Sequence, residues 1–319
     1  MKNKIVVLIF IGLLLWFSGL NLSLNAQTTE KKVKIPKGLK TKIEIAYKFV
    51  EKYGKYEQVL DNKQIYQYDK KGNEIEKAGY LADGKLTYKW LYKYDDRGNQ
   101  IEMALYNAAG KLTYKYPHKY DDKGNLIESA GYGADGKLID FKSLFKYDDK
   151  DNQIERAWCD ADGKLKRKDI SKYDDKDNRI ELAWYGADGK LTDKFLFKYD
   201  DKGNEIEEAL YDADGKLKIF ESLYKYKYDD KGNLIERAVY TDDGRLMEKE
   251  SYKYKYDDKG NLIEKAEYGY YGKLIWKWLY KYDDKGNRTE QVDYKIEERA
   301  GKFQEIPIAQ SDCEYEFYD

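Results

Sequence analysis

The chain has 319 residues, with 59 Lys and Arg against 60 Asp and Glu. Charged residues make up 37% of the sequence and both signs are interleaved, so the clustered basic surface of a nucleic-acid-binding protein is absent. The 34 tyrosines and only 3 prolines favour an ordered β-sheet over disorder.

Residues 1–26 have the features of a cleaved secretory signal peptide: two lysines, an apolar run, and then small and polar residues, with cleavage expected after Ala26. Leu24 fits a cleavage site poorly, so a retained N-terminal anchor is the alternative. The apolar run is short for a membrane span and no second run follows, so we expect no span after cleavage. We therefore expect a periplasmic or secreted protein.

Residues 27–42 form a Lys-rich leader, with six lysines in "EKKVKIPKGLKTK" at 30–42. We interpret it as a solvated segment, and contact with an anionic surface is the alternative.

A repeat of about 26 residues dominates the rest of the chain. The dipeptide Tyr-Asp recurs at intervals of 26 to 29 residues. The tyrosines are Tyr68, Tyr94, Tyr120, Tyr147, Tyr173, Tyr199, Tyr228, Tyr256 and Tyr282. A fixed period in this range predicts an array in which each copy is one supersecondary unit stabilised by its neighbours.

Each unit contains two predicted hairpin turns. The first reads Asp-Asp-Lys-Gly-Asn, and its fourth residue is Gly in seven copies and Asp in two, Asp151 and Asp177. Both residue types accept the left-handed backbone of a type I turn closed by a bulge. The second turn reads Ala-Asp-Gly-Lys in most copies.

The runs between the turns alternate with the period of two that is typical of strands. From Leu86 to Tyr94, leucine and aromatic residues share one face while Thr and Lys occupy the other. We therefore predict an all-β repeat array of antiparallel hairpins, a long coiled or spiral meander sheet of about eighteen strands over residues 68–290. Residues 43–67 are an N-terminal cap or degenerate repeat, residues 291–319 are a C-terminal cap, and strand edges at either end could pair between molecules.

The segments "YDDKGNLIE" and "DDGRL" (242–246) resemble the YD repeats of the RHS family over about residues 66–290. In that family the repeats form a β-sheet that spirals into a hollow shell or serve as surface repeats. The resemblance implies a structural or binding role rather than catalysis. The unit is longer than is usual in the family, and we expect no effector domain after the repeats.

Catalytic patterns are lacking, and we predict no enzyme. The single histidine, His118, occupies a position where other copies have Tyr or Phe, and no Gly-x-Ser-x-Gly turn exists to hold a nucleophile. Repeated Asp-Asp pairs at turns are typical of backbone capping rather than of a glycosidase site.

We also predict no metal site and no cofactor. Asp160-Ala-Asp162-Gly and Asp212-Ala-Asp214-Gly look like the start of a calcium loop, but their Gly is fourth instead of sixth. Cys159 lacks a surrounding cluster of metal ligands, and a disulfide with Cys313 would require the array to curl back on itself.

The remaining candidates are aromatic residues that could stack on sugars or cations, or fill the core. The candidate ligand-binding residues are Trp90, Trp158, Trp184, Trp276 and Trp278. We expect a non-enzymatic exported β-repeat protein that acts as a structural or protein-binding surface in the cell envelope. The alternative is a glycan or cell-wall binding module in which these tryptophans form an open row.

Overall fold

The computed structural model describes residues 36–139, 141–218 and 223–318. The predicted signal peptide and most of the Lys-rich leader lie outside the described residues. All regular structure in the described part is antiparallel β-sheet, in 21 strands. The strands are β1 (Leu39–Lys52), β2 (Lys55–Tyr68), β3 (Glu74–Leu81), β4 (Leu86–Tyr94), β5 (Gln100–Asn107), β6 (Leu112–Tyr120), β7 (Leu126–Ser129), β8 (Tyr132–Gly133), β9 (Lys142–Tyr147), β10 (Gln153–Cys159), β11 (Leu165–Tyr173), β12 (Arg179–Gly186), β13 (Leu191–Tyr199), β14 (Glu205–Asp212), β15 (Leu223–Tyr228), β16 (Leu234–Tyr240), β17 (Leu246–Tyr256), β18 (Leu262–Tyr268), β19 (Leu274–Tyr282), β20 (Arg288–Arg299) and β21 (Lys302–Phe317).

Apart from β7 to β9, each strand pairs with its neighbours in sequence, as expected for a meander of hairpins. Strands β7 and β8 both pair with β6, so together they fill one strand position in the sheet. The Asp-Asp-Lys-Gly-Asn turns therefore lie at one end of the strands and the Ala-Asp-Gly-Lys turns at the other. Among the described residues, no helix is long and apolar enough to cross a membrane.

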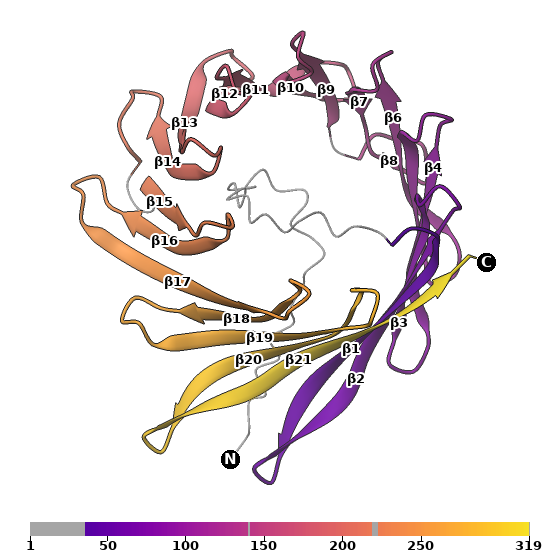
Figure 1. Cartoon of the computed structure of the whole chain (residues 1–319). Helices are drawn as coiled ribbons and strands as arrows, with labels where there is room; N and C mark the ends of the chain where they lie inside the picture. Colours follow the sequence, from indigo (N-terminus) through magenta and orange to yellow (C-terminus); the bar gives the residue numbers. More distant parts are fainter. Residues whose placement is uncertain (1–35, 140, 219–222, 319) are drawn as a thin grey trace, which may run out of the picture.

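The prediction of an open, coiled meander is wrong, because the sheet closes into a barrel. Strand β1 pairs with β21 from Leu39↔Phe317 to Lys48↔Ala309, and Figure 1 shows the resulting ring of strands. The hydroxyl of Tyr318 also donates a hydrogen bond of 2.6 Å to the carbonyl of Tyr68 across this seam. The free strand edges expected at the two ends of the array are thus paired with each other.

Two long hairpins make this closure possible. Strands β1 and β2 have 14 residues each and β21 has 16, whereas most repeat strands have 6 to 9. The predicted caps were residues 43–67 and 291–319. Residues 43–67 lie within the β1–β2 hairpin, and residues 291–317 lie within the β20–β21 hairpin. Strand β1 begins at Leu39, which is inside the predicted leader and is only 2% exposed.

The seam can be tested with a disulfide. Glu44 lies opposite Cys313 in the β1–β21 register, and such directly opposed residues have Cα atoms within the ~4.4–6.8 Å that a disulfide requires. We expect Glu44→Cys to form a disulfide with Cys313 under mild oxidation, detected as faster migration on non-reducing gels. The variant Gln64→Cys on β2 is the control, because it pairs with β1 and β3 rather than β21. Equal crosslinking of both variants, or of neither, would contradict the closed barrel.

Candidate functional site

The two faces of the sheet differ in how strictly the repeat is kept. One face, here called the constant face, carries a glutamate and a small apolar residue that recur from unit to unit, while the tyrosine of the Tyr-Asp step recurs on the opposite face. The glutamates occupy the third position after the turn asparagine in all nine units: Glu76, Glu102, Glu128, Glu155, Glu181, Glu207, Glu236, Glu264 and Glu290. Two positions further along is a buried alanine in eight units, such as Ala78 at 1% exposed, and Val292 in the ninth.

Lysines on adjacent strands neutralise the glutamates of the constant face. Glu102 forms ion pairs with Lys93 at 3.0 Å and with Lys115 at 2.7 Å. Glu128 forms equivalent ion pairs with Lys119 and Lys142. Each half-exposed pair contributes only ~0.2–1 kcal/mol. Because the pairs recur from unit to unit, their combined effect is to hold one register around the ring.

The Asp-Asp-Lys-Gly-Asn turns use their first aspartate for local structure. Asp95 Oδ1 accepts hydrogen bonds from the backbone N–H of Arg97 and of Asn99, and Oδ2 accepts one from the Asn99 side chain. This last bond is the main reason that the pKa of Asp95 is lowered. Gly98 has φ of +88°, and the register shifts at Tyr94, as the predicted turn and bulge require. The first aspartate of each pair thus caps a turn.

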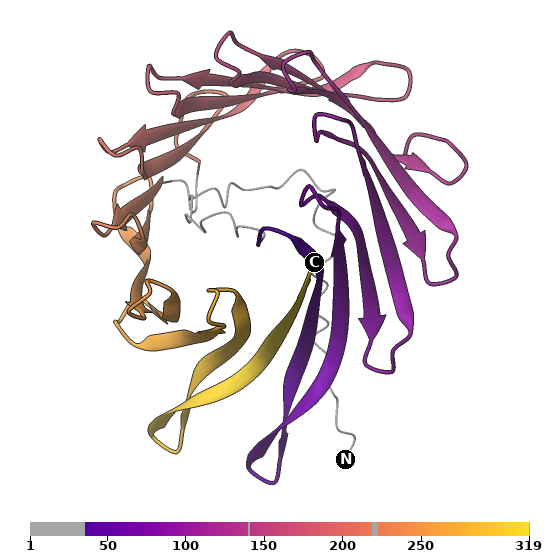
Figure 2. The same cartoon turned by 45° about the vertical axis from the view of Figure 1, so that its right-hand side comes forward.

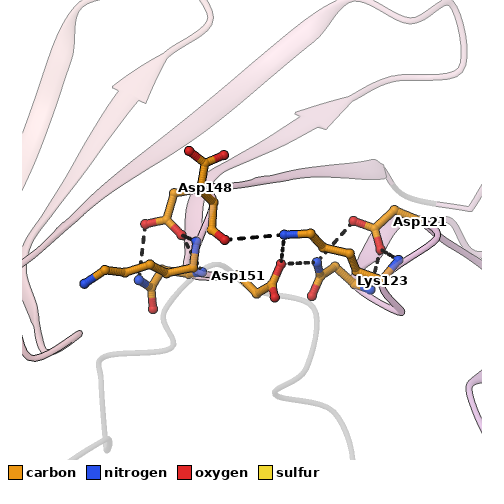
Figure 3. Close-up of polar contacts among 8 residues, drawn as sticks. Asp121, Lys123, Asp148 and Asp151 are labelled. Atoms are coloured by element: carbon orange, nitrogen blue, oxygen red, sulfur yellow. Dashed lines mark hydrogen bonds and ion pairs between the residues drawn. The ribbon is translucent and has the colours of Figure 1, made fainter.

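Neighbouring turns at this end of the barrel are linked by cations. Lys123 donates to Asp151 Oδ1 at 2.9 Å, and Figure 3 shows its side chain reaching toward the turn of Asp148 and Asp151. The Asn125 side chain donates to the same oxygen at 3.0 Å. Asp151 has φ of +68°, so its carboxylate provides contacts that the glycine of other copies lacks.

In six of the nine units the tyrosine of the Tyr-Asp step connects the unit to the one before it through a hydrogen bond to a backbone carbonyl. Tyr173 donates a hydrogen bond of 2.9 Å to the carbonyl of Gln153, twenty residues earlier. Tyr94 and Tyr120 make the same bond to Glu74 and Gln100. Each bond ties a hairpin to the start of the preceding one, which explains why Tyr recurs there.

The opposite face, here called the variable face, changes from unit to unit. The fourth position after the turn asparagine illustrates this, with seven residue types in nine copies. These residues are Lys77, Met103, Ser129, Arg156, Leu182, Glu208, Arg237, Lys265 and Gln291. All five candidate tryptophans lie on this face and are half-buried, so they neither form a sealed core nor stand fully open.

Arginines cover two of the tryptophans. The guanidinium of Arg156 lies 4.3 Å from the centre of the Trp158 ring, and that of Arg167 lies 4.9 Å from Trp158 and 4.3 Å from Trp184. Asp169 forms an ion pair with Arg167 at 3.0 Å. Burial raises the pKa of Asp169 despite this ion pair. Stacked guanidinium groups occupy the ring surfaces that a sugar would use.

The other three tryptophans are less covered. Trp276 and Trp278 stack along β19 with ring centres 6.3 Å apart, and the Lys265 ammonium lies 5.0 Å from the Trp278 ring. Trp90 stacks with Tyr92 on β4 and contacts Tyr116 on β6. The five residues thus form separate aromatic clusters with different neighbours.

An acidic pair on β14 was missed by the sequence analysis. Glu205 is 7% exposed and Glu208 is 4% exposed. Tyr226 donates to Glu208 Oε2 at 3.4 Å, while Glu205 Oε1 is buried without a hydrogen-bond partner among the described residues. Burial, followed by the nearby Glu208 charge, raises the pKa of Glu205 to about 8. The only sequence signal for Glu208 is that no other unit has glutamate at the fourth position after the turn asparagine.

The remaining predicted candidates have structural partners. His118 Nδ1 lies 2.9 Å from the Gln100 carbonyl, and burial lowers the pKa of this histidine. Asp160 accepts backbone hydrogen bonds from Asp162 and Lys164 in its turn. Cys159 and Cys313 are buried free thiols. In the part of the chain that the structure describes, no group of three or more His, Cys, Asp or Glu side chains could hold a metal ion.

Comparisons with known proteins give only weak matches. No protein-family model and no curated protein matches the sequence. The crystal structure of TcdB2-TccC3 without its hypervariable C-terminal region aligns with 76% of this chain and 15% of its own length, at 14% identity and a TM-score of 0.34. The Photorhabdus luminescens Tc holotoxin pore aligns with 76% of this chain and 16% of its own, at 14% identity and a TM-score of 0.28.

A third solved structure matches over most of its length. A porin-like protein from Bacteroides uniformis aligns with 86% of this chain and 97% of its own, at 15% identity and a TM-score of 0.34. This chain spans about a sixth of the length of the two toxin chains. At these TM-scores the matches assign neither a family nor a function.

The hydrogen bond between units can be tested by removing one hydroxyl. We expect Tyr173→Phe to lower the free energy of unfolding by about 1 kcal/mol, because the Gln153 carbonyl loses its donor. Urea denaturation measures this loss. The control is Tyr185→Phe on the constant face, whose hydroxyl has no hydrogen bond among the described residues, and it should change stability by less than about 0.5 kcal/mol. Equal losses in both variants would argue against the connecting role.

The buried acidic pair predicts an unusual pH dependence. Because the pKa of Glu205 rises from 4.5 to about 8 on folding, the folded chain holds a proton that the unfolded chain loses. The free energy of unfolding should therefore fall between these two pH values, by up to ~1.4 kcal/mol per pH unit. Glu205→Gln should be more stable than the wild type at pH 8, with the difference lost near pH 4.

Urea denaturation at several pH values tests this prediction, with Glu207→Gln as the control. Glu207 forms an ion pair with Lys198 at 2.6 Å on the constant face, so its substitution should give a small loss at pH 8 and no gain. The idea fails if Glu205→Gln is destabilised at pH 8.

Proposed function

We propose that this chain is a non-enzymatic, exported β-repeat protein of the cell envelope whose variable face binds another protein. The observation that carries the proposal is the contrast between the two faces. The constant face keeps Glu in nine of nine units, while the opposite face of the same strands carries seven residue types at one position. A purely structural sheet gives no reason for seven residue types at a position that directly follows an invariant glutamate.

The chemistry of the variable face favours a partner with a varied surface. Strands β10 and β11 present Arg156 and Arg167 beside Trp158, whereas β14 to β18 carry Glu208, Glu267 and other acids. A protein partner presents different groups to each sector, and electrostatic complementarity then fixes its orientation. A repeating glycan would instead suit nearly identical sites in every unit.

The proposal also concerns the repeat family and the absence of a catalytic role. We propose that the units are YD-like repeats of the RHS type, because their tyrosine and aspartate form the connection between units and the turn cap described above. We assign no catalytic group and no cofactor. Export is inferred from residues 1–26 alone.

A glycan or cell-wall ligand is the second candidate, and one observation favours it. Trp276 and Trp278 stack side by side on one strand without an arginine over either ring among the described residues. Adjacent aromatic faces of this kind can stack on sugar rings. Trp158 and Trp184 do not favour a glycan, since guanidinium groups lie over them.

A matched pair of variants on β19 tests the function. We expect Trp276→Ala with Trp278→Ala on the variable face to lose one specific envelope protein that the wild-type chain captures, measured by quantitative mass spectrometry. The control is Lys277→Ala with Leu279→Ala, which changes the constant face of the same strand and should keep that protein.

Two outcomes would contradict the protein-binding proposal. Equal capture by both variants would show that the variable face is not the binding surface near β19. Loss of binding to purified peptidoglycan, with tryptophan fluorescence that peptidoglycan changes only in the wild type, would support the glycan function instead.

A further inference from the structure

Three hairpin turns form a continuous sector at the Ala-Asp-Gly-Lys end of the barrel. They are residues 269–273 between β18 and β19, residues 299–302 between β20 and β21, and residues 52–55 between β1 and β2. They follow one another around the ring because β19 pairs with β20 and β21 pairs with β1. We call them the basic turn sector.

The sector extends beyond the rest of the rim. Residues 55–60 of β2 pair with β1 but not with β3, so this hairpin projects about 20 Å past the repeat units. Figures 1 and 2 show the β1–β2 and β20–β21 hairpins reaching out on the same side of the ring. Their tips are therefore the first parts of this end to meet a surface.

Aromatic side chains are unusually exposed in this sector. Tyr53 is 105% exposed and Tyr271 is 86% exposed, and Phe303, which directly follows the turn at 299–302, is 56% exposed. Tyr270 stacks edge-on against Tyr271 with ring centres 5.1 Å apart. Tyr270 and Tyr271 occupy the two turn positions at which most other units have Ala and Asp, so they depart from the repeat in an exposed turn.

The charges of the sector also depart from the repeat. The three turns contain Lys52, Lys55, Lys273, Arg299 and Lys302 and no carboxylate, whereas six of the seven other turns on this rim contain aspartate. Carboxylates stand on the flanking strands instead, at Glu51, Glu57, Glu297 and Glu298. Lys52 and Arg299 pair with glutamates on the adjoining strands. Lys55, Lys273 and Lys302 make no ion pair within residues 36–139, 141–218 and 223–318.

Tyr53 has a backbone conformation that is unfavourable for a bulky residue. Its φ is +52°, and the following Gly54 has φ of +74°. Asn or Gly fits the first position of such a turn, while a bulky side chain is strained there. A strained and fully exposed aromatic residue is best explained by a contact outside the chain.

We propose that the basic turn sector docks on an anionic lipid surface. Tyrosine and phenylalanine suit the boundary between acyl chains and headgroups, and lysines near that boundary are attracted by anionic headgroups. The attraction is local, because the chain as a whole has a net charge of −1 and its other turns on this rim are mostly acidic. The barrel would then stand with this end toward the membrane surface, whatever its variable face binds.

Vesicle binding tests the proposal with a variant that is designed to fold. The substitutions Tyr53→Asn, Tyr270→Ala and Tyr271→Asp relieve the strained turn and convert residues 269–273 to Gly-Ala-Asp-Gly-Lys, a turn that the chain already contains at 133–137 and 186–190. Partition of the purified chain into vesicles of phosphatidylcholine and phosphatidylglycerol should fall about tenfold in this variant. Pure phosphatidylcholine vesicles should bind the wild type weakly.

The matched control is Lys259→Asn in the turn between β17 and β18, at the opposite end of the barrel. It changes the net charge by the same single unit as Tyr271→Asp and should leave vesicle binding unchanged. Unchanged binding of the triple variant would overturn the proposal, because the exposed aromatic residues would then make no contribution to binding. Binding to polyglutamate without binding to vesicles would also overturn it, in favour of an acidic protein.

Discussion

The pairing of β1 with β21 is the constraint on which the molecule depends. In a meander of hairpins every strand obtains two neighbours from the repeat itself, except the first and the last. Their unpaired N–H and C=O groups would otherwise be open to other chains. The register from Leu39↔Phe317 to Lys48↔Ala309 satisfies both edges at once, so the terminal hairpins belong to the sheet as fully as the repeats do.

Within this closed sheet the two faces carry separate tasks. The bonds that hold one unit to the next use backbone groups, turn aspartates, tyrosine hydroxyls and the Lys–Glu pairs of the constant face. None of them requires a particular residue at the position of Met103 or Arg156 on the other face. The half-buried positions of the variable face can therefore change with less cost to folding than Phe195 or Val239, which are buried on the same face. Such tolerance is expected of a surface that diversifies for recognition.

Much of this architecture could be predicted from sequence because it is local. Each unit contains the signals for its own hairpins: the period of two along the strands, the Gly or Asp residues at left-handed positions, and the turn sequences. These local signals predicted the hairpins correctly. Closure could not be predicted, since it depends on how twist and stagger accumulate over twenty strands. The stacking of Arg167 on Trp184 and the burial of Glu205 could not be predicted either. Both depend on contacts between adjacent strands, at positions where the sequence shows no repeat pattern.

Closure also has a consequence for how the chain reaches its native state. Leu39 begins the first strand and Phe317 ends the last, so their pairing has the longest sequence separation in the sheet and is among the last contacts that the folding chain can make. Hairpins can form early from local contacts, whereas a seam of such long sequence separation must wait and forms slowly. Until then the growing sheet keeps two open edges. The lifetime of that open intermediate, rather than the stability of the finished barrel, sets the risk of aggregation during biogenesis.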